Sequence, residues 1–183
     1  LTSQSRQADL IAELVEKQVG REIEPFSLSD LNRQKLTSQE LQGAVTVLHF
    51  WRYRDTPLKE PYGQVGYLDF LYEQHRKAGL QVYGVAVDGR FNDDQTRAAA
   101  VRSVRKLREF MHLSYPILLD GGEFIRQFGD PRLIGAELPL YVVIGRDGRV
   151  SHYHVGMHTI DHQRGLYELN DIVVKALSEE APQ

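Results

Sequence analysis

The chain has 183 residues, of which 42% are hydrophobic, and it carries a formal net charge of −3. This hydrophobic content is enough for one continuous core without disulfides or a metal ion. Basic residues are scattered among acidic ones, which excludes the basic surface of a nucleic-acid-binding protein. No window approaches 18 consecutive apolar residues, so we expect no transmembrane segment. The start at Leu1 has neither an initiator methionine nor a secretory-signal layout, which indicates a processed or excised fragment.

The first quarter of the chain predicts a helix, short polar elements and one strong strand. Apolar residues at helical spacing predict an amphipathic helix over Ala8–Val19. The stretch Pro25–Leu31 alternates apolar and polar residues, and Thr37–Leu41 has an N-cap signature with one helical turn. Val45–Trp51 is rich in β-branched and aromatic residues and predicts a buried strand.

The next elements form a βαβ unit with that strand. Apolar positions predict a helix over Tyr62–Ala78, which Gly79 ends, and Leu80–Asp88 predicts a second buried strand. A right-handed crossover makes the two strands parallel, so their carboxyl ends, at Trp51 and Asp88, lie at the same edge of the sheet.

The second half of the chain continues the alternation of helices and strands. Its predicted elements, in order, are a polar insertion near Arg90–Arg102, a helix carrying Val104, Leu107, Phe110 and Met111, a strand within Tyr115–Asp120, a short helix over Phe124–Phe128, a loop over Gly129–Leu138, a β-hairpin of Leu140–Ile144 and Val150–Val155, a helix over Gly165–Leu177 and a polar tail.

The loop that follows the first strong strand is the most informative segment. It opens the next helix, where free backbone N–H groups and the helix dipole lower the pKa of a thiol. The whole chain, however, contains no cysteine, and this loop offers Asp55, Thr56, Leu58 and Lys59 instead.

Four segments resemble the thioredoxin-like superfamily, and in particular its AhpC/TSA and redoxin branch. They are PFSLSDL (25–31), LTSQELQG (36–43), VLHFW (47–51) and ELPLYVVIGRDG (137–148). The resemblance implies an α/β thioredoxin-like fold with a central mixed sheet, helices on both faces, an added N-terminal helix and an insertion near 90–102. It divides the chain into an N-terminal helical extension (1–24), a redoxin domain (25–178) and a polar tail (179–183).

Two registers align the loop with the superfamily's cysteine motifs. The Trp-x-x-x-Cys-x-x-Cys pattern of TlpA-type thiol-disulfide oxidoreductases puts Asp55 and Leu58 at the cysteine positions. The Asp-Thr-Pro-Gly-Cys-Thr-x-Glu pattern of bacterioferritin-comigratory-type peroxiredoxins puts Lys59 at the peroxidatic position. Both activities need a thiolate, so we predict a redox-silent domain with no catalytic residue and no cofactor.

The resemblance also implies a binding groove that is kept although the cysteines are missing. A cis peptide before Pro139 would leave adjacent backbone free to pair with an extended chain. We therefore predict a protein or peptide partner, bound in this groove or on the aromatic helix Tyr62–Tyr72. The predicted groove residues are Trp51, Arg54, Asp55, Thr56, Pro57, Leu58, Leu138, Pro139 and Leu140.

Two polar groups have alternative interpretations. The cluster Arg52–Asp55 suits capture of a carboxylate or phosphate, but a solvated turn is the simpler interpretation. The histidines His152 and His154 share one strand face, and His158 and His162 could share one helical face. Because zinc needs three or four convergent ligands, surface histidines without metal are the default. His49, inside the central strand, fits a buried, hydrogen-bonded histidine better than a catalytic one.

Two other functions compete with the binding module. One is an enzyme of metal-dependent or acid–base mechanism on the same fold, carried by the histidines or by Arg52, Arg54 and Asp55. The other is a purely structural domain within a longer chain. Similarity to thiol-disulfide oxidoreductases and their anchored relatives implies an extracytoplasmic, periplasmic or envelope-associated, location.

Overall fold

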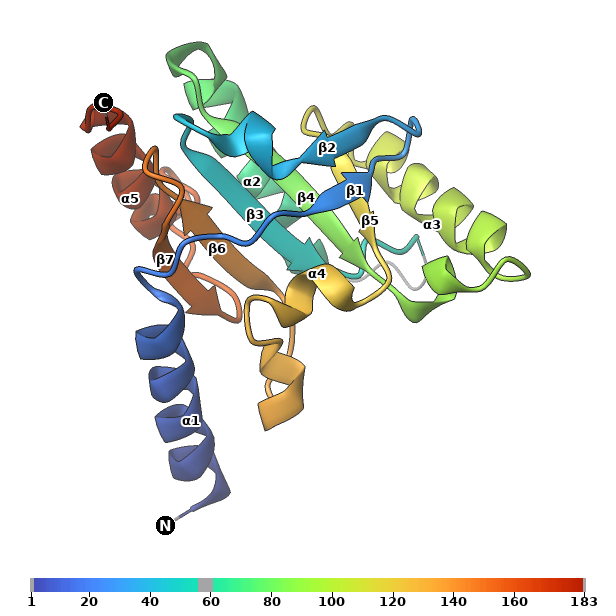
Figure 1. Ribbon diagram of the computed structural model, residues 1–183, viewed down its shortest axis with the longest axis horizontal. Helices are drawn as coiled ribbons and strands as arrows, with labels where there is room; N and C mark the ends of the chain where they lie inside the picture. The colour runs from blue at the N-terminus through green and yellow to red at the C-terminus, as the bar shows by residue number, and fades with distance from the viewer. Residues whose placement is uncertain (1, 56–60, 183) are drawn as a thin grey trace.

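A five-stranded mixed sheet forms the centre of the computed structural model, which describes residues 2–55 and 61–182 (Figure 1). The strand order is β5-β4-β3-β6-β7, with β3, β4 and β5 parallel and with β6 and β7 added antiparallel. The strands are β3 (Thr46–Trp51), β4 (Gln81–Val87), β5 (Ile117–Asp120), β6 (Leu140–Ile144) and β7 (Val150–Val155). The thioredoxin-like arrangement expected from the sequence is therefore confirmed.

Helix α2 (Val65–His75) makes the crossover between β3 and β4, with the 3₁₀ turns η2 (Tyr62–Gln64) and η3 (Arg76–Ala78) at its two ends. The parallel register pairs Trp51 with Ala86. The carboxyl ends of β3 and β4 thus lie side by side, as predicted, and the loop after Trp51 begins at this edge.

Alternating side chains along the strands build one core on each face of the sheet. Val47 of β3 packs with α2, α3 (Arg97–Phe110) and α5 (Tyr167–Ser178). Leu48 and Phe50 point to the other face, where they pack with α4 (Glu123–Arg126). Helices on both faces are confirmed (Figure 1).

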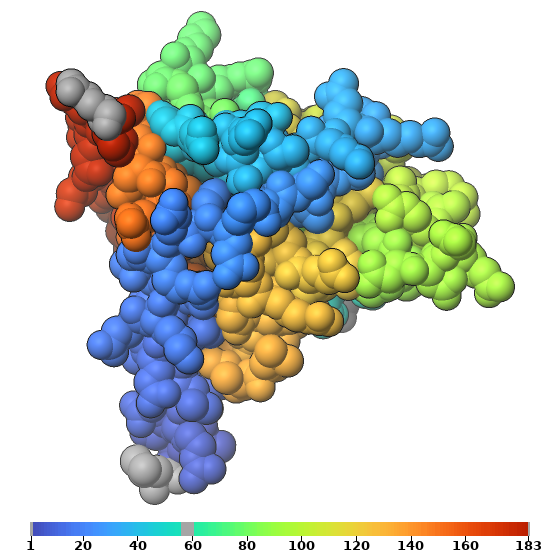
Figure 2. All heavy atoms as spheres, viewed as in Figure 1, coloured from blue at the N-terminus to red at the C-terminus, as the bar shows by residue number. Residues whose placement is uncertain are grey.

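The N-terminal segment is joined to the edge strand of the sheet. Helix α1 (Ser3–Gln18) begins five residues earlier than predicted, with Thr2 as its N-cap, and it projects from the body of the molecule (Figure 2). Beyond the helix, the Gly20 N–H donates to the Val150 carbonyl at 2.7 Å, and the Val150 N–H donates to the Arg21 carbonyl at 2.9 Å. These bonds cover part of the exposed edge of β7.

Three short elements differ from the sequence-based expectations. The strands β1 (Ser27–Ser29) and β2 (Lys35–Thr37) form a small ribbon, of which only the first part was expected. The predicted polar insertion overlaps η4 (Gly89–Asn92) and the first six residues of α3, where Ala100 is buried against the core. The predicted loop over Gly129–Leu138 contains η5 (Pro131–Ile134), which the Asp130 side chain caps. Across the described residues, no helix has the length and apolar character needed to span a bilayer.

A close contact between Tyr53 and Gly84 fixes the loop after β3 to β4. Tyr53 adopts a left-handed conformation with φ of 51°, and its ring is completely buried. A Cβ atom on Gly84 would lie 2.6 Å from the Tyr53 Oη and 2.9 Å from the Tyr115 ring. Glycine at this position therefore makes the room into which Tyr53 turns.

We predict that Gly84→Ala lowers the free energy of unfolding by about 1–3 kcal/mol, because a well-packed core resists an added methyl group. Urea unfolding, monitored through the fluorescence of Trp51, measures this change in the free energy of unfolding. The matched control is Gly89→Ala, since a Cβ there meets no atom within 4 Å, and its effect should stay within about 0.5 kcal/mol. Equal stability of the two variants would contradict the contact.

Candidate functional site

A buried network of neutral side chains holds the loop after β3 in place. The Tyr53 hydroxyl lies 2.5 Å from the His49 Nδ1 and 3.1 Å from the Tyr115 hydroxyl. Burial lowers the pKa of His49 to about 3, against a smaller opposing effect of the Gly63 carbonyl, and burial raises the pKa of both tyrosines. His49 is thus the buried, hydrogen-bonded histidine that was expected. Tyr53 belongs to the core, so its predicted place in an exposed polar cluster was wrong.

Arg54, on the same loop, is held by the carboxylate at the end of β4. Its Nε lies 3.5 Å from the Asp88 Oδ2, and Arg90 also binds this carboxylate, with Nη2 at 2.8 Å. Burial alone would raise the pKa of Asp88, but the hydrogen bonds from Arg90 and the charge of Arg54 hold it below its usual value. The Arg54 guanidinium is therefore already paired with the Asp88 carboxylate.

Asp55, which stands at a cysteine position in one register, is tied to α3. The Ser103 hydroxyl donates to the Asp55 Oδ1 at 2.5 Å, and the Asp55 N–H donates to the Ser103 Oγ at 3.1 Å. Lys106 adds a contact of 3.9 Å from its Nζ to the Asp55 Oδ2. The other predicted loop positions, Thr56, Pro57, Leu58 and Lys59, lie outside the described residues.

The Leu138–Pro139 peptide bond is cis, as the resemblance implied. The Pro139 carbonyl accepts from the Gly156 N–H at 2.8 Å. The side chains of Leu138, Pro139 and Leu140 are buried, so Leu140 contributes no side chain to a groove here. A cavity of about 460 Å³ lies beside Leu138 and Pro139, and Ile11 of α1 also lines it.

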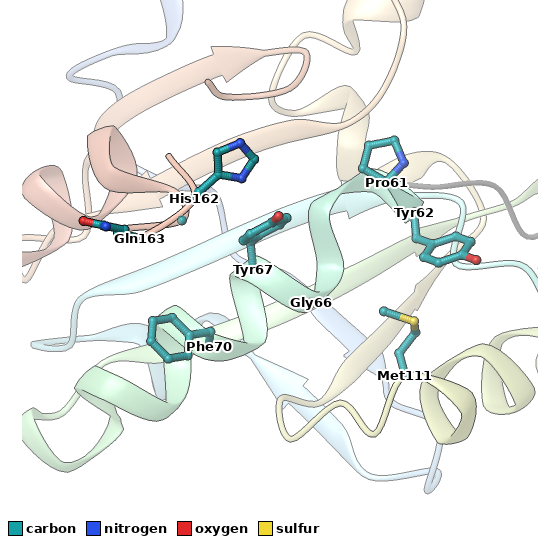
Figure 3. A pocket seen from close by; sticks show the side chains of 9 residues that line it. Pro61, Tyr62, Gly66, Tyr67, Phe70, Met111, His162 and Gln163 are labelled. Carbon is teal, nitrogen blue, oxygen red and sulfur yellow. The ribbon is translucent and has the colours of Figure 1, made fainter. Parts of the chain in front are cut away.

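A second, more apolar cavity lies on the outer side of α2, beside Pro61. We call it the aromatic pocket; it has a volume of about 390 Å³ (Figure 3). Phe70 is 54% exposed and Tyr67 is 38% exposed at its rim. The residues that define it are Pro61, Tyr62, Tyr67, Phe70, Met111 and His162. It coincides with the aromatic helix that the sequence offered as an alternative binding surface.

The buried amide of Gln64 connects the beginning of α2 to two other parts of the fold. Its Oε1 accepts from the Tyr141 hydroxyl at 2.7 Å and from the His158 N–H at 3.0 Å. Its Nε2 donates to the His158 carbonyl at 2.7 Å. Sequence reasoning missed this residue, because a glutamine near a helix start carries no distinctive signal.

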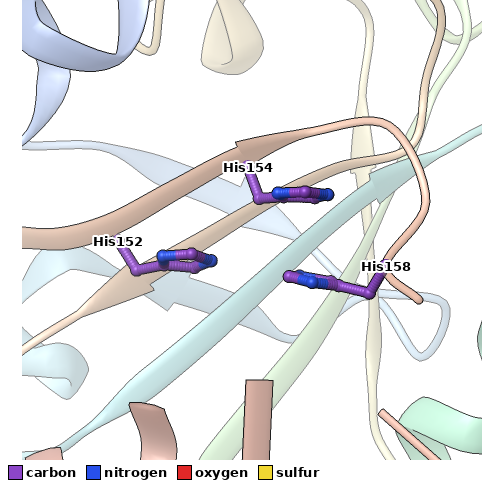
Figure 4. A group of neighbouring side chains, drawn as sticks. All are labelled: His152, His154 and His158. Carbon is purple, nitrogen blue, oxygen red and sulfur yellow. The ribbon is translucent and has the colours of Figure 1, made fainter. Parts of the chain in front are cut away.

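Three of the four candidate histidines come together, and one does not. His152, His154 and His158 gather at β7, whereas His162 lines the aromatic pocket (Figure 4). The structure contains no helix over residues 158–162, so the predicted helical face was wrong. Burial, followed by the charge of His154, lowers the pKa of His152 to about 4 and that of His158 to about 3. Both rings are therefore neutral at pH 7.

Comparison with known proteins gives a consistent picture. Residues 19–153 match the model of the AhpC/TSA family. The chain belongs to this family. It is 25% identical over 155 residues to the thiol-disulfide oxidoreductase ResA of Bacillus cereus, and the match covers 82% of this chain and 78% of that protein.

Solved structures show the same fold. A thioredoxin-family thiol:disulfide interchange protein from Chlorobium tepidum TLS superposes with a TM-score of 0.65 at 20% identity, over 87% of this chain and 97% of that one. A thiol:disulfide interchange protein from Bacteroides sp. gives a TM-score of 0.60 at 15% identity, over 88% and 91% of the two chains.

This AhpC/TSA-family chain keeps the scaffold of a thiol-disulfide oxidoreductase without a sulfur nucleophile. Dithiol exchange needs a thiolate that attacks a disulfide, and the chain has no cysteine. A carboxylate does not perform that reaction, and the Asp55 carboxylate is already bound by Ser103.

We predict that Asp55 and Ser103 stabilise the fold jointly, with a coupling energy of about 1–2 kcal/mol in a double-mutant cycle, because a charge-assisted hydrogen bond joins them. The cycle uses Asp55→Ala and Ser103→Ala, measured by urea unfolding. In the control cycle Ser178→Ala replaces Ser103→Ala, since the Ser178 hydroxyl donates to the Lys175 carbonyl instead. A coupling energy near zero for the first pair would show that the loop is not held by this contact.

Proposed function

We propose that this AhpC/TSA-family domain is redox-silent and binds an extended segment of a protein partner at the former redox edge. In this proposal an aromatic or aliphatic side chain of the partner enters the aromatic pocket. The observation that carries the proposal is the aromatic pocket itself, which lies directly beyond the loop that would have carried the thiols.

The chemistry of the pocket supports an apolar ligand. Tyr67 and Phe70 leave large parts of their rings in water, and Phe110 at the end of α3 is 59% exposed. Exposed apolar surface around a cavity is typical of a protein–protein contact. Aromatic side chains also provide much contact area at a small cost in conformational entropy, which suits them to anchor a partner.

The predicted groove supplies a second element of the same proposal. Leu138 precedes the cis peptide bond and lines the cavity beside α1, and in the proposal its main chain pairs with an extended chain of the partner. Pairing of this kind gives affinity through the main chain, while pockets select side chains. Trp51, Arg54 and Asp55 would then form the polar and aromatic rim of the groove.

The proposal extends to the compartment of the protein. Thiol-disulfide oxidoreductases and their anchored relatives, which the chain resembles, imply an extracytoplasmic location. We propose that the partner is a protein of the periplasm or cell envelope.

Binding of a displayed peptide tests the proposal. Random peptides displayed on phage are selected against the folded domain, and the enriched peptide is titrated while Trp51 fluorescence is recorded. Trp51 is the only tryptophan, and its ring lies against Gly63 next to the pocket. We expect the double variant Tyr67→Ser and Phe70→Ser to weaken binding at least about tenfold, or ~1.4 kcal/mol.

The matched control is Leu133→Ser, because Leu133 is 78% exposed on η5 and does not line the pocket. This variant should bind like the unmodified domain. If the selection enriches no peptide, or if the pocket variant binds as tightly as the control, the binding-module function is wrong and a structural role replaces it.

A further inference from the structure

Three imidazole rings meet at the edge strand β7, outside the aromatic pocket and the groove. His152 and His154 are two residues apart on β7, so both rings lie on the face that Tyr141 and Val143 of β6 share. His158 follows the turn at Gly156, and its ring returns to the same place (Figure 4). One nitrogen from each ring lies within 4.8 Å of the others.

The backbone that carries these rings is already fixed. β7 is paired with β6 from Val150 to Val155, with one bulge. The main chain of His158 donates to and accepts from the side chain of Gln64, at 3.0 and 2.7 Å. The ring of His158 also packs edge-on against Tyr141, with 4.7 Å between ring centroids. Convergence of the three nitrogens therefore needs only side-chain rotation.

Among the described residues, three of the five buried side-chain nitrogens without a hydrogen-bond partner belong to this cluster. Within the part of the chain that the structure describes, both ring nitrogens of His158 and the Nε2 of His152 are buried without a hydrogen-bond partner. His158 is only 4% exposed, so solvent does not replace the missing partners. Buried polar atoms are nearly always paired, so several unpaired nitrogens on converging rings point to a bound ion or water.

We propose that His152, His154 and His158 bind one divalent late first-row transition-metal ion, such as Zn²⁺, through one imidazole nitrogen each. Imidazole is a preferred ligand of zinc, copper and nickel, and the absence of thiolates disfavours softer ions. The fourth position belongs to a water molecule or to Glu168, whose Oε2 lies 3.8 Å from the His158 Nδ1. Three histidines with an open fourth position form a recurrent zinc geometry.

Neighbouring oxygens assign a nitrogen of two rings to the metal. The His154 Nε2 lies 3.1 Å from the Met157 carbonyl, which fixes the proton there and leaves Nδ1 free to bind the ion. The His158 Nδ1 faces Glu168, so its Nε2 is the ligand when this carboxylate serves as an outer partner.

Binding must separate rings that now stack. His154 and His158 are nearly parallel, with 3.9 Å between their centroids. Bonds of 2.0–2.1 Å in a tetrahedral site place ligand nitrogens about 3.3 Å apart, so the rings must turn to point their nitrogens at one ion.

Direct metal titration of the full chain without an affinity tag tests the site. Isothermal titration with Zn²⁺, with bound metal counted after desalting, should give one ion per chain. The variant His152→Gln with His154→Gln should lose at least about 100-fold in affinity, since outer partners alone account for 10- to 100-fold at such sites. Bound Co²⁺ should show the visible absorption of a tetrahedral site.

The matched control is His162→Gln, because His162 lies in the aromatic pocket and not in the cluster. It should bind Zn²⁺ like the unmodified chain, and Mg²⁺ should bind to neither. Circular dichroism verifies the folding of each variant; if the double variant is unfolded, the single variant His154→Gln decides by the same criterion. Equal Zn²⁺ affinity of the folded variant and the control, or no saturable binding at all, would overturn the site.

Discussion

The hydrogen bonds of the Gln64 side chain hold together the parts of the fold that carry the aromatic pocket and the histidine cluster. Its amide joins the beginning of α2, the hydroxyl of Tyr141 on β6 and the main chain of His158. All of these groups are buried, so loss of the amide would leave several polar atoms without partners in a low-dielectric interior. Because α2 carries the aromatic pocket and His158 belongs to the histidine cluster, one amide sets the positions of both.

A second constraint acts on the loop after β3, where three consecutive side chains, those of residues 53–55, each contact a defined partner. Tyr53 enters the core above Gly84, Arg54 pairs with Asp88, and Asp55 binds Ser103. A thiol-disulfide oxidoreductase needs a reactive, accessible sulfur at this place. Here the side chains of Tyr53, Arg54 and Asp55 are already held in place, and in the proposed function this preorganisation lowers the cost of binding a partner.

The sequence was sufficient for most of the fold because the strands carry strong signals. Val45–Trp51 and Leu140–Ile144 are dense in β-branched and aromatic residues, and the structure places strands there. The second strand of the ribbon, β2, and the turn η5 were missed, since elements this short carry little periodicity. The start of α3 was missed because its first turns are polar on the exposed side.

The site was less predictable, because it depends on contacts between distant residues. His158 meets Gln64 across 94 positions, and its approach to His152 follows from the turn at Gly156. Local spacing suggested a helical pair with His162 instead. The burial of Tyr53 had one available signal: Gly84 interrupts the valine-rich strand β4, which indicates a close approach by another group.

The central claim is that the former redox edge now binds rather than reacts, and amide chemical-shift mapping tests it most directly. ¹⁵N-labelled protein is titrated with a selected peptide, and the shifted amides are placed on the structure. The account predicts the largest shifts in Tyr62–Phe70, at Met111 and near His162, with smaller shifts at Leu138. Shifts confined to a remote surface, such as the β1-β2 ribbon, would contradict it.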